Sequence, residues 1–123
     1  MREILFRGKR LDNCEWVEGV LRHFPSGSLA IRSELIGHTV IVSPNTVGQY
    51  TGLKDKNGLR IFEGDIIEWD PFTMLCGVVG FDEGGFCANG HFLSDGLYHG
   101  FFDGLVIGNI HDDPELIERS EST

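Results

Sequence analysis

The sequence has few cysteines, few basic residues and no long apolar run. Its three cysteines, Cys14, Cys76 and Cys87, are an odd number without a close pair, which favours reduced thiols over a disulfide framework. No apolar stretch approaches the ~20 residues of a membrane-spanning helix. The N-terminus also lacks the apolar segment of about 7–15 residues found in signal peptides. We therefore expect a cytoplasmic protein that is not embedded in a membrane.

Basic residues are outnumbered by acidic ones. The chain has 10 Lys and Arg against 19 Asp and Glu, a formal net charge of −9. Binding to a phosphate backbone relies on cations that displace counterions, so nucleic acid is a disfavoured partner and anionic membrane is repelled. The local exception is the N-terminal cluster Arg2, Arg7, Lys9 and Arg10. We interpret these four residues as solvated positions of a first strand and turn, with a local basic patch as the alternative.

Glycine is the abundant residue. The 123 residues include 17 glycines, about twice the usual share of ~7%. They stand singly among β-branched and aromatic residues, which is typical of short strands separated by turns and bulges. Apolar residues make up 41% of the chain, enough for a core, and the length suits one domain over residues 1–123.

Alternating apolar residues between turn signals predict several hairpins. Residues 16–23 and 29–32 flank a turn and should pair, and the β-branched run at 39–42 favours a third strand. Asn57-Gly58 is the strongest hairpin signal, because both residues tolerate positive φ. It joins strands predicted at 47–53 and 59–62.

The second half continues the pattern of short strands. The Gly64-Asp65 pair enters a strand at 66–69, and we expect the carboxylate to bind backbone N–H groups in the bend. Further strands are predicted at 76–81, 86–88 and 105–110.

The C-terminal residues carry a helix signal. Asp112-Asp113-Pro114 followed by acidic Glu115 is typical of a helix start, which predicts a short helix whose Leu116 and Ile117 dock on the sheet. The predicted fold class is mainly β. We expect a small antiparallel barrel, SH3-like or related, centred on residues 47–82, with additional strands and this short C-terminal helix.

Motifs for catalysis and for cofactors are not found. GxSxG and the phosphate-binding GxxxxGK[ST] are absent from the sequence, and acidic pairs fall in predicted turns and caps. The nearest approach to a metal site is Cys87 with His91 and His99, one close pair where structural zinc usually has two. We name no catalytic residue and expect no metal and no cofactor.

Two apolar loops are the candidate binding sites. Loops are normally polar, yet residues 71–75 and 97–102 are rich in aromatic and aliphatic side chains. Exposed aromatic loops are typical of protein interfaces. The alternative is that both loops fold over a barrel end and complete the core. The candidate binding residues are Trp69, Phe72, Met74, Tyr98, Phe101 and Phe102.

Three motifs resemble a known family. They are REILFRGKR at residues 2–10, TVGQYTGLKDKNG at 46–58 continuing to Ile67, and VIGNIHDDPEL at 106–116. In this order they resemble the YopX family, small proteins of bacteriophages and prophages, although an aromatic residue more often stands at the position of His111. The resemblance spans essentially the whole chain, while residues 74–102 match no motif.

The resemblance implies a fold and an origin, without any catalytic residue. We interpret the central motif as a set of folding instructions carried by Tyr50, Gly52, Asn57, Gly58, Gly64 and Asp65.

The sequence thus favours a phage- or prophage-encoded, non-enzymatic binding or regulatory protein that acts on a host or phage protein. Alternatives are a single-stranded nucleic-acid-binding β-barrel using Trp16, Trp69 or Phe72, and a small enzyme with an unrecognised active site. Apolar loops and sheet edges also make a homo-oligomer plausible.

Overall fold

A computed structural model gives the fold, and the chain divides into two compact units, Met1–Tyr50 and Thr51–Thr123. Each unit is described by itself, and the single domain expected over the whole chain stays a prediction. The structure describes residues 4–70, 75–82, 85–88, 91–92, 97–98, 101–102 and 104–116.

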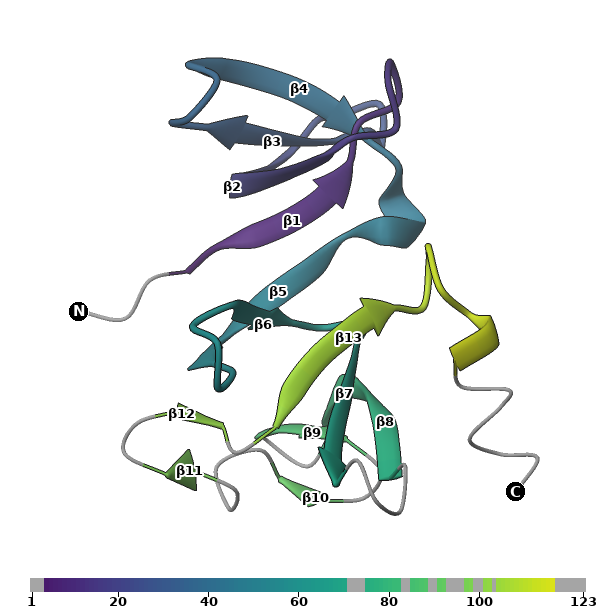
Figure 1. Cartoon of the computed structure of the whole chain (residues 1–123). Helices are drawn as coiled ribbons and strands as arrows, with labels where there is room; N and C mark the ends of the chain where they lie inside the picture. The colour runs from purple at the N-terminus through teal and green to yellow at the C-terminus, as the bar shows by residue number, and fades with distance from the viewer. Residues whose placement is uncertain are drawn as a thin grey trace. The chain divides into compact units, whose positions relative to one another are not determined.

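The first unit is an antiparallel sheet in the order β4-β3-β2-β1-β5 (Figure 1, purple to blue). The hairpin predicted at 16–23 and 29–32 is confirmed, as is the strand predicted at 39–42. A short 3₁₀ helix, η1 (Pro44–Thr46), separates β4 from β5. The strands are β1 (Phe6–Lys9), β2 (Trp16–His23), β3 (Leu29–Ser33), β4 (His38–Val42) and β5 (Gly48–Lys54).

Alternation along the strands gives this sheet a core face. Opposite residues of an antiparallel pair point to the same side, and Leu21, Ile31 and Val40 lie opposite one another on β2, β3 and β4. Ile31 and Val42 have no exposed surface, and Val17 and Val40 are buried with them. The apolar residues at every second position therefore bury one face and leave the other to solvent.

Gly19 marks a change of partner within β2. Residues Trp16 to Gly19 pair with β1, whereas Val20 to His23 pair with β3. A Cβ atom added at Gly19 would overlap the carbonyl oxygen of Arg32. Glycine therefore permits the close approach of two backbones at the point where β2 changes partner.

The second unit begins with the end of β5, which is paired with β6 (Arg60–Phe62). The predicted Asn57-Gly58 hairpin is confirmed, and Gly58 has a φ of +84°. A second sheet has the order β10-β9-β8-β7-β13, and β11 pairs with β12. These strands are β7 (Asp65–Asp70), β8 (Leu75–Asp82), β9 (Gly85–Ala88), β10 (His91–Phe92), β11 (Leu97–Tyr98), β12 (Phe101–Phe102) and β13 (Leu105–Asn109).

The second unit has its own apolar core. Ile61 and Ile67 have no exposed surface, and they pack with Val79 and Ala88. Leu53, Phe86 and Val106 are partly buried against this cluster. The mainly antiparallel β character predicted from the sequence is thus confirmed.

The predicted barrel is wrong. Residues 47–82 do not form one closed sheet, because β5 and β6 belong to one sheet and β7 and β8 to another. In the first unit an isolated bridge joins Arg10 to Val42, with Ser43 N–H donating to Lys9 O at 2.8 Å. After this bridge the chain enters the turn at residues 11–13, so the pairing does not extend into a ladder.

The predicted C-terminal helix is not seen. The side-chain Oδ1 of Asn109 accepts the N–H groups of His111 and Asp112, both at 3.0 Å. These bonds form a turn at residues 109–112, just before the expected start at Asp113 and Pro114, and the Asp113 carboxylate accepts the upstream Asn109 N–H at 3.2 Å. Helical geometry among the described residues here is limited to Glu115 and Leu116, and residues 117–123 lie outside the described part.

Replacement of Gly19 tests the crowded change of partner in β2. We expect Gly19→Ala to lower the free energy of unfolding by about 1–3 kcal/mol, because the new methyl group overlaps backbone that cannot rotate away. Gly80→Ala is the matched control, since nothing lies within 4 Å of its Cβ position. Urea denaturation followed by circular dichroism measures both. Equal stability of the two variants would contradict this account of Gly19.

Candidate interaction surface

The solvent-facing side of the first sheet, which we call the outer face, is the best-defined candidate site. Strand registers place its residues together: Lys9 lies opposite Trp16, and Val20 lies opposite Arg32. Arg32 in turn lies opposite Thr39 on β4. The outer face comprises Arg7, Lys9, Trp16, Glu18, Val20, Arg22, Arg32, Thr39 and Ile41.

Apolar side chains lie at the centre of the outer face. Val20 is 50% exposed and Ile41 is 41% exposed, while Ala30 between their strands is fully buried. Arg22 and Arg32 are exposed beside them. Within the described part of the chain, no hydrogen bond or ion pair engages either guanidinium group. This arrangement of aliphatic side chains beside arginines resembles the composition of protein interfaces, where arginine is enriched.

The outer face has the opposite charge to the rest of the chain. It carries four cations, Arg7, Lys9, Arg22 and Arg32, against the single carboxylate of Glu18. Residues 1–50 contain six Lys and Arg and five Asp and Glu, whereas residues 51–123 contain four and fourteen. The formal charge is therefore +1 in the first unit and −10 in the second. The net charge of −9 for the whole chain therefore conceals a nearly neutral first unit and a strongly acidic second unit.

Two of the N-terminal cations lie over an aromatic ring. Arg7 Cζ is 4.7 Å and Lys9 Nζ is 5.6 Å from the centroid of Trp16. Both distances suit a cation–π interaction. Trp16 is half-buried and is already covered by cations, so its ring is a poor platform for a stacked base.

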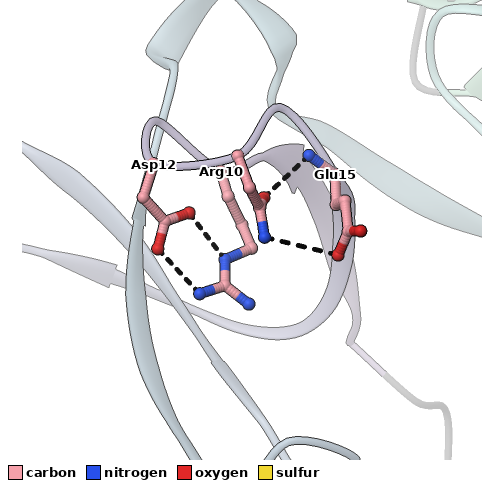
Figure 2. A network of polar contacts seen from close by, with 4 residues as sticks. Arg10, Asp12 and Glu15 are labelled. Carbon is pink, nitrogen blue, oxygen red and sulfur yellow. Dashed lines mark hydrogen bonds and ion pairs between the residues drawn. The ribbon is translucent and has the colours of Figure 1, made fainter.

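A third N-terminal cation is paired with a carboxylate. Arg10 donates from Nε and from an Nη atom to the two oxygens of Asp12, at 2.9 and 2.8 Å (Figure 2). The backbone N–H of Arg10 donates to Glu15 O at 2.9 Å, which closes the turn between β1 and β2. This bidentate pair lowers the pKa of Asp12 and raises the pKa of Arg10. Arg2, the fourth cation of the cluster, lies outside the described residues.

Two buried carboxylates organise the second unit. Asp55 has no exposed surface; its Oδ1 accepts the N–H groups of Asn57 and Leu59, both at 2.9 Å. Its Oδ2 accepts the N–H of Val106 at 2.9 Å, which ties the turn after β5 to β13. Asp65 is 2% exposed and accepts the N–H of Phe62 at 2.8 Å. The predicted binding of a backbone N–H by the Gly64-Asp65 bend is confirmed.

The remaining residues of the central motif have local roles. Gly52 and Gly64 have φ values of +87° and +90°, which residues other than glycine rarely adopt. Asn57 and Gly58 form the turn after β5, and Tyr50 is buried. These observations support a folding role for the motif.

The aromatic loop candidates lie outside the described side chains. Phe72 and Met74 are in this group, and so are Trp69, Tyr98, Phe101 and Phe102, which lie in strands but are themselves described by backbone alone. Their role in binding stays a prediction. The side chains of His91 and His99, the histidines grouped with Cys87 in the sequence, also lie outside, and the described side chains contain no group of three metal-ligating residues.

The sequence prediction missed Val20, Arg22, Arg32 and Ile41. Val20 and Arg22 could have been found from the sequence, because every second residue of the predicted strand at 16–23 points to the same side. What was missing is the register that brings Arg32 and Ile41 next to that strand.

Sheets of short antiparallel strands, with buried carboxylates in their turns, define a small, mainly β protein. A family profile described as "YopX protein" matches residues 5–118, so the chain belongs to the YopX family. It is also similar to the crystal structure of protein EF1440 from Enterococcus faecalis, at 28% sequence identity and a TM-score of 0.61. That match covers 95% of this chain and 99% of the other. No curated protein matches the sequence of this chain. Among the described residues, no helix has the length and apolar character needed to cross a membrane.

The pair of Arg10 and Asp12 gives a titration test. We expect the Asp12 carboxyl to titrate below the ordinary value of about 3.9. A lowered folded-state pKa means that the pair favours folding above the unfolded pKa and that this contribution disappears as pH falls through the folded pKa. Carbon-detected NMR titration measures the value. Arg10→Gln should return it toward normal, and Arg32→Gln should leave it unchanged. An unchanged pKa in Arg10→Gln would contradict the assignment.

Asp55 gives a stability test. Asp55→Asn replaces one acceptor oxygen by a donor, so at least one of three partly buried N–H groups loses its partner. We expect a cost of about 1–3 kcal/mol. Amide hydrogen exchange should become faster at Val106, or at Asn57 and Leu59. Glu34→Gln, at an exposed carboxylate of the first unit, is the control and should stay within about 0.5 kcal/mol. Unaltered exchange at all three amides would refute the role given to Asp55.

Proposed function

We propose that this YopX-family protein is a phage- or prophage-encoded, non-enzymatic binding protein that acts on a host or phage protein in the bacterial cytoplasm. The observation that carries the proposal is the outer face. Its exposed aliphatic centre provides apolar surface to bury, and its arginines select a partner of negative charge. The expected partner is therefore an acidic protein surface with apolar side chains at its centre.

Single-stranded nucleic acid is the second candidate. The four cations of the outer face beside Trp16 favour it, because basic residues next to an aromatic ring are common in such sites. Two features favour a protein instead. Arg7 and Lys9 already cover the Trp16 ring. Val20 and Ile41 expose aliphatic surface, which a partner protein can bury and a phosphate backbone cannot.

The apolar loops remain a separate proposed contact. Phe72 and Phe101 are the residues to replace there, because large aromatic side chains dominate the energy of most protein interfaces. They test whether a partner uses the loops in addition to the outer face.

Capture from host lysate, with and without nuclease, tests the proposal. The tagged wild-type protein should retain a stoichiometric protein after nuclease treatment, and Arg22→Glu/Arg32→Glu should lose it. Lys54→Glu/Lys56→Glu is the matched control: it changes the net charge equally, at exposed residues of the second unit, and should keep the partner. Phe72→Ser and Phe101→Ser report on the loops.

Two results would overturn the proposal. Partners that vanish with nuclease would support the nucleic-acid candidate. Equal loss in both charge variants would show that net charge alone, and not the outer face, governs capture.

A further inference from the structure

We propose that the outer face binds the second unit of another copy of this chain, so that the protein assembles with itself. This inference rests on the proposed function, since it names the acidic protein surface that the outer face binds. The contact surface on the other copy is the end of β13 with the turn that follows it, which we call the C-terminal turn and define by Ile107, Ile110, Asp112 and Glu115.

Charge is the first argument. The first unit has a formal charge of +1 and the second unit −10, of which the buried Asp55 and Asp65 contribute two, so every copy carries a net acidic second unit and a basic outer face. On the outer face, Arg22 and Arg32 are exposed and have no side-chain partner within the described residues. Two copies of net charge −9 repel at long range, so the attraction is local, between the arginines of the outer face and the carboxylates that they meet, and it favours one orientation.

The C-terminal turn has the complementary composition. Asp112 and Glu115 are exposed, and Ile107 and Ile110 are 37% and 38% exposed. Residues 107–115 thus offer two exposed carboxylates and two exposed isoleucines, which match the two arginines and the aliphatic Val20 and Ile41 of the outer face. Contact therefore pairs charge with charge and buries aliphatic surface on both sides, which satisfies both requirements of a stable interface.

The C-terminal turn is also rigid enough to serve as a docking surface. Asp113 Oδ2 accepts the Asn109 N–H at 3.2 Å, and Asn109 Nδ2 donates to Asp112 Oδ2 at 3.2 Å. Ile110 N–H donates to Gly64 O at 2.9 Å. Because these bonds fix the turn before contact, little conformational entropy is lost when a second copy binds.

The geometry of such an assembly follows from its two different surfaces. A contact between unlike surfaces closes as a reciprocal dimer or a ring, or continues as an open chain. Each copy then has both surfaces covered only when the assembly closes.

Sedimentation velocity of the purified full-length protein over a range of concentrations tests the inference. Wild-type protein should associate reversibly. Arg22→Glu/Arg32→Glu should reduce the association constant at least about tenfold, as should Asp112→Lys/Glu115→Lys. Circular dichroism and thermal melting confirm that each variant is folded.

The charge exchange is the decisive variant. Combining all four substitutions restores opposite charges across the contact and should return association to within about threefold of wild type. Lys54→Glu/Lys56→Glu, with the same net charge as Arg22→Glu/Arg32→Glu, should associate as well as wild type. A wild-type monomer at all concentrations, or failure of the exchange to restore association, would overturn the inference.

The inference can fail without the proposed function failing. A wild-type monomer that still captures a nuclease-resistant protein through Arg22 and Arg32 would leave the proposed function standing and replace the second copy by another acidic protein. Binding of a fluorescent oligothymidine by the purified protein, lost in Arg22→Glu/Arg32→Glu, would overturn both and identify single-stranded nucleic acid as the occupant.

Discussion

Every buried backbone N–H needs an acceptor, and in the second unit aspartate side chains provide several of them. Strand β13 lies at one end of its sheet, so β7 can pair with only one of its sides. The N–H groups of Val106 and Asn109 donate to the carboxylates of Asp55 and Asp113. Lys56 N–H donates to Gly104 O just before the strand. The turn after β5 and the turn after β13 are thereby fixed to the same strand.

This use of carboxylates has a further consequence for the edge of the sheet. An exposed edge strand with unpaired N–H groups is a template for unwanted strand pairing. Side-chain acceptors at Val106 and Asn109 occupy those groups without adding another strand. Gly108 is part of the same arrangement, because a Cβ there would lie 2.5 Å from Asp113 Oδ2 and 3.0 Å from Leu116 Cδ1. The acidic residues at Asp55 and Asp113 are thus structural rather than part of a diffuse negative surface.

The sequence predicted those features that depend on neighbours in the chain. The hairpin joining β2 and β3, the Asn57-Gly58 turn and the Asp65 contact with Phe62 each involve residues a few positions apart. The barrel was wrong because the division of strands between sheets depends on long-range pairs. The bond from Val106 to Asp55 spans 51 positions and leaves no local signal.

The C-terminal helix and the outer face show two other limits of sequence reasoning. Asp113 and Pro114 are sound helix signals, but the Asp113 carboxylate accepts the upstream N–H of Asn109 at 3.2 Å and so belongs to the turn after β13. Half of the outer face follows from alternation in residues 16–23. The other half requires the register of β3 and β4, which alone places Arg32 and Ile41 beside Val20 and Arg22.

The outer face is linked to the core by the same alternation. Leu21 and Ile31 can point inward only if Val20, Arg22 and Arg32 point outward, so the fold of the first unit creates this surface in every correctly folded copy. The chain has a net charge of −9, and the exposed arginines make the electrostatic potential positive at this one surface. Charge of this kind mainly sets encounter rate and orientation, whereas buried aliphatic area provides affinity. A face that combines both, on a chain whose other unit is strongly acidic, therefore favours a contact that is specific in orientation and sensitive to salt.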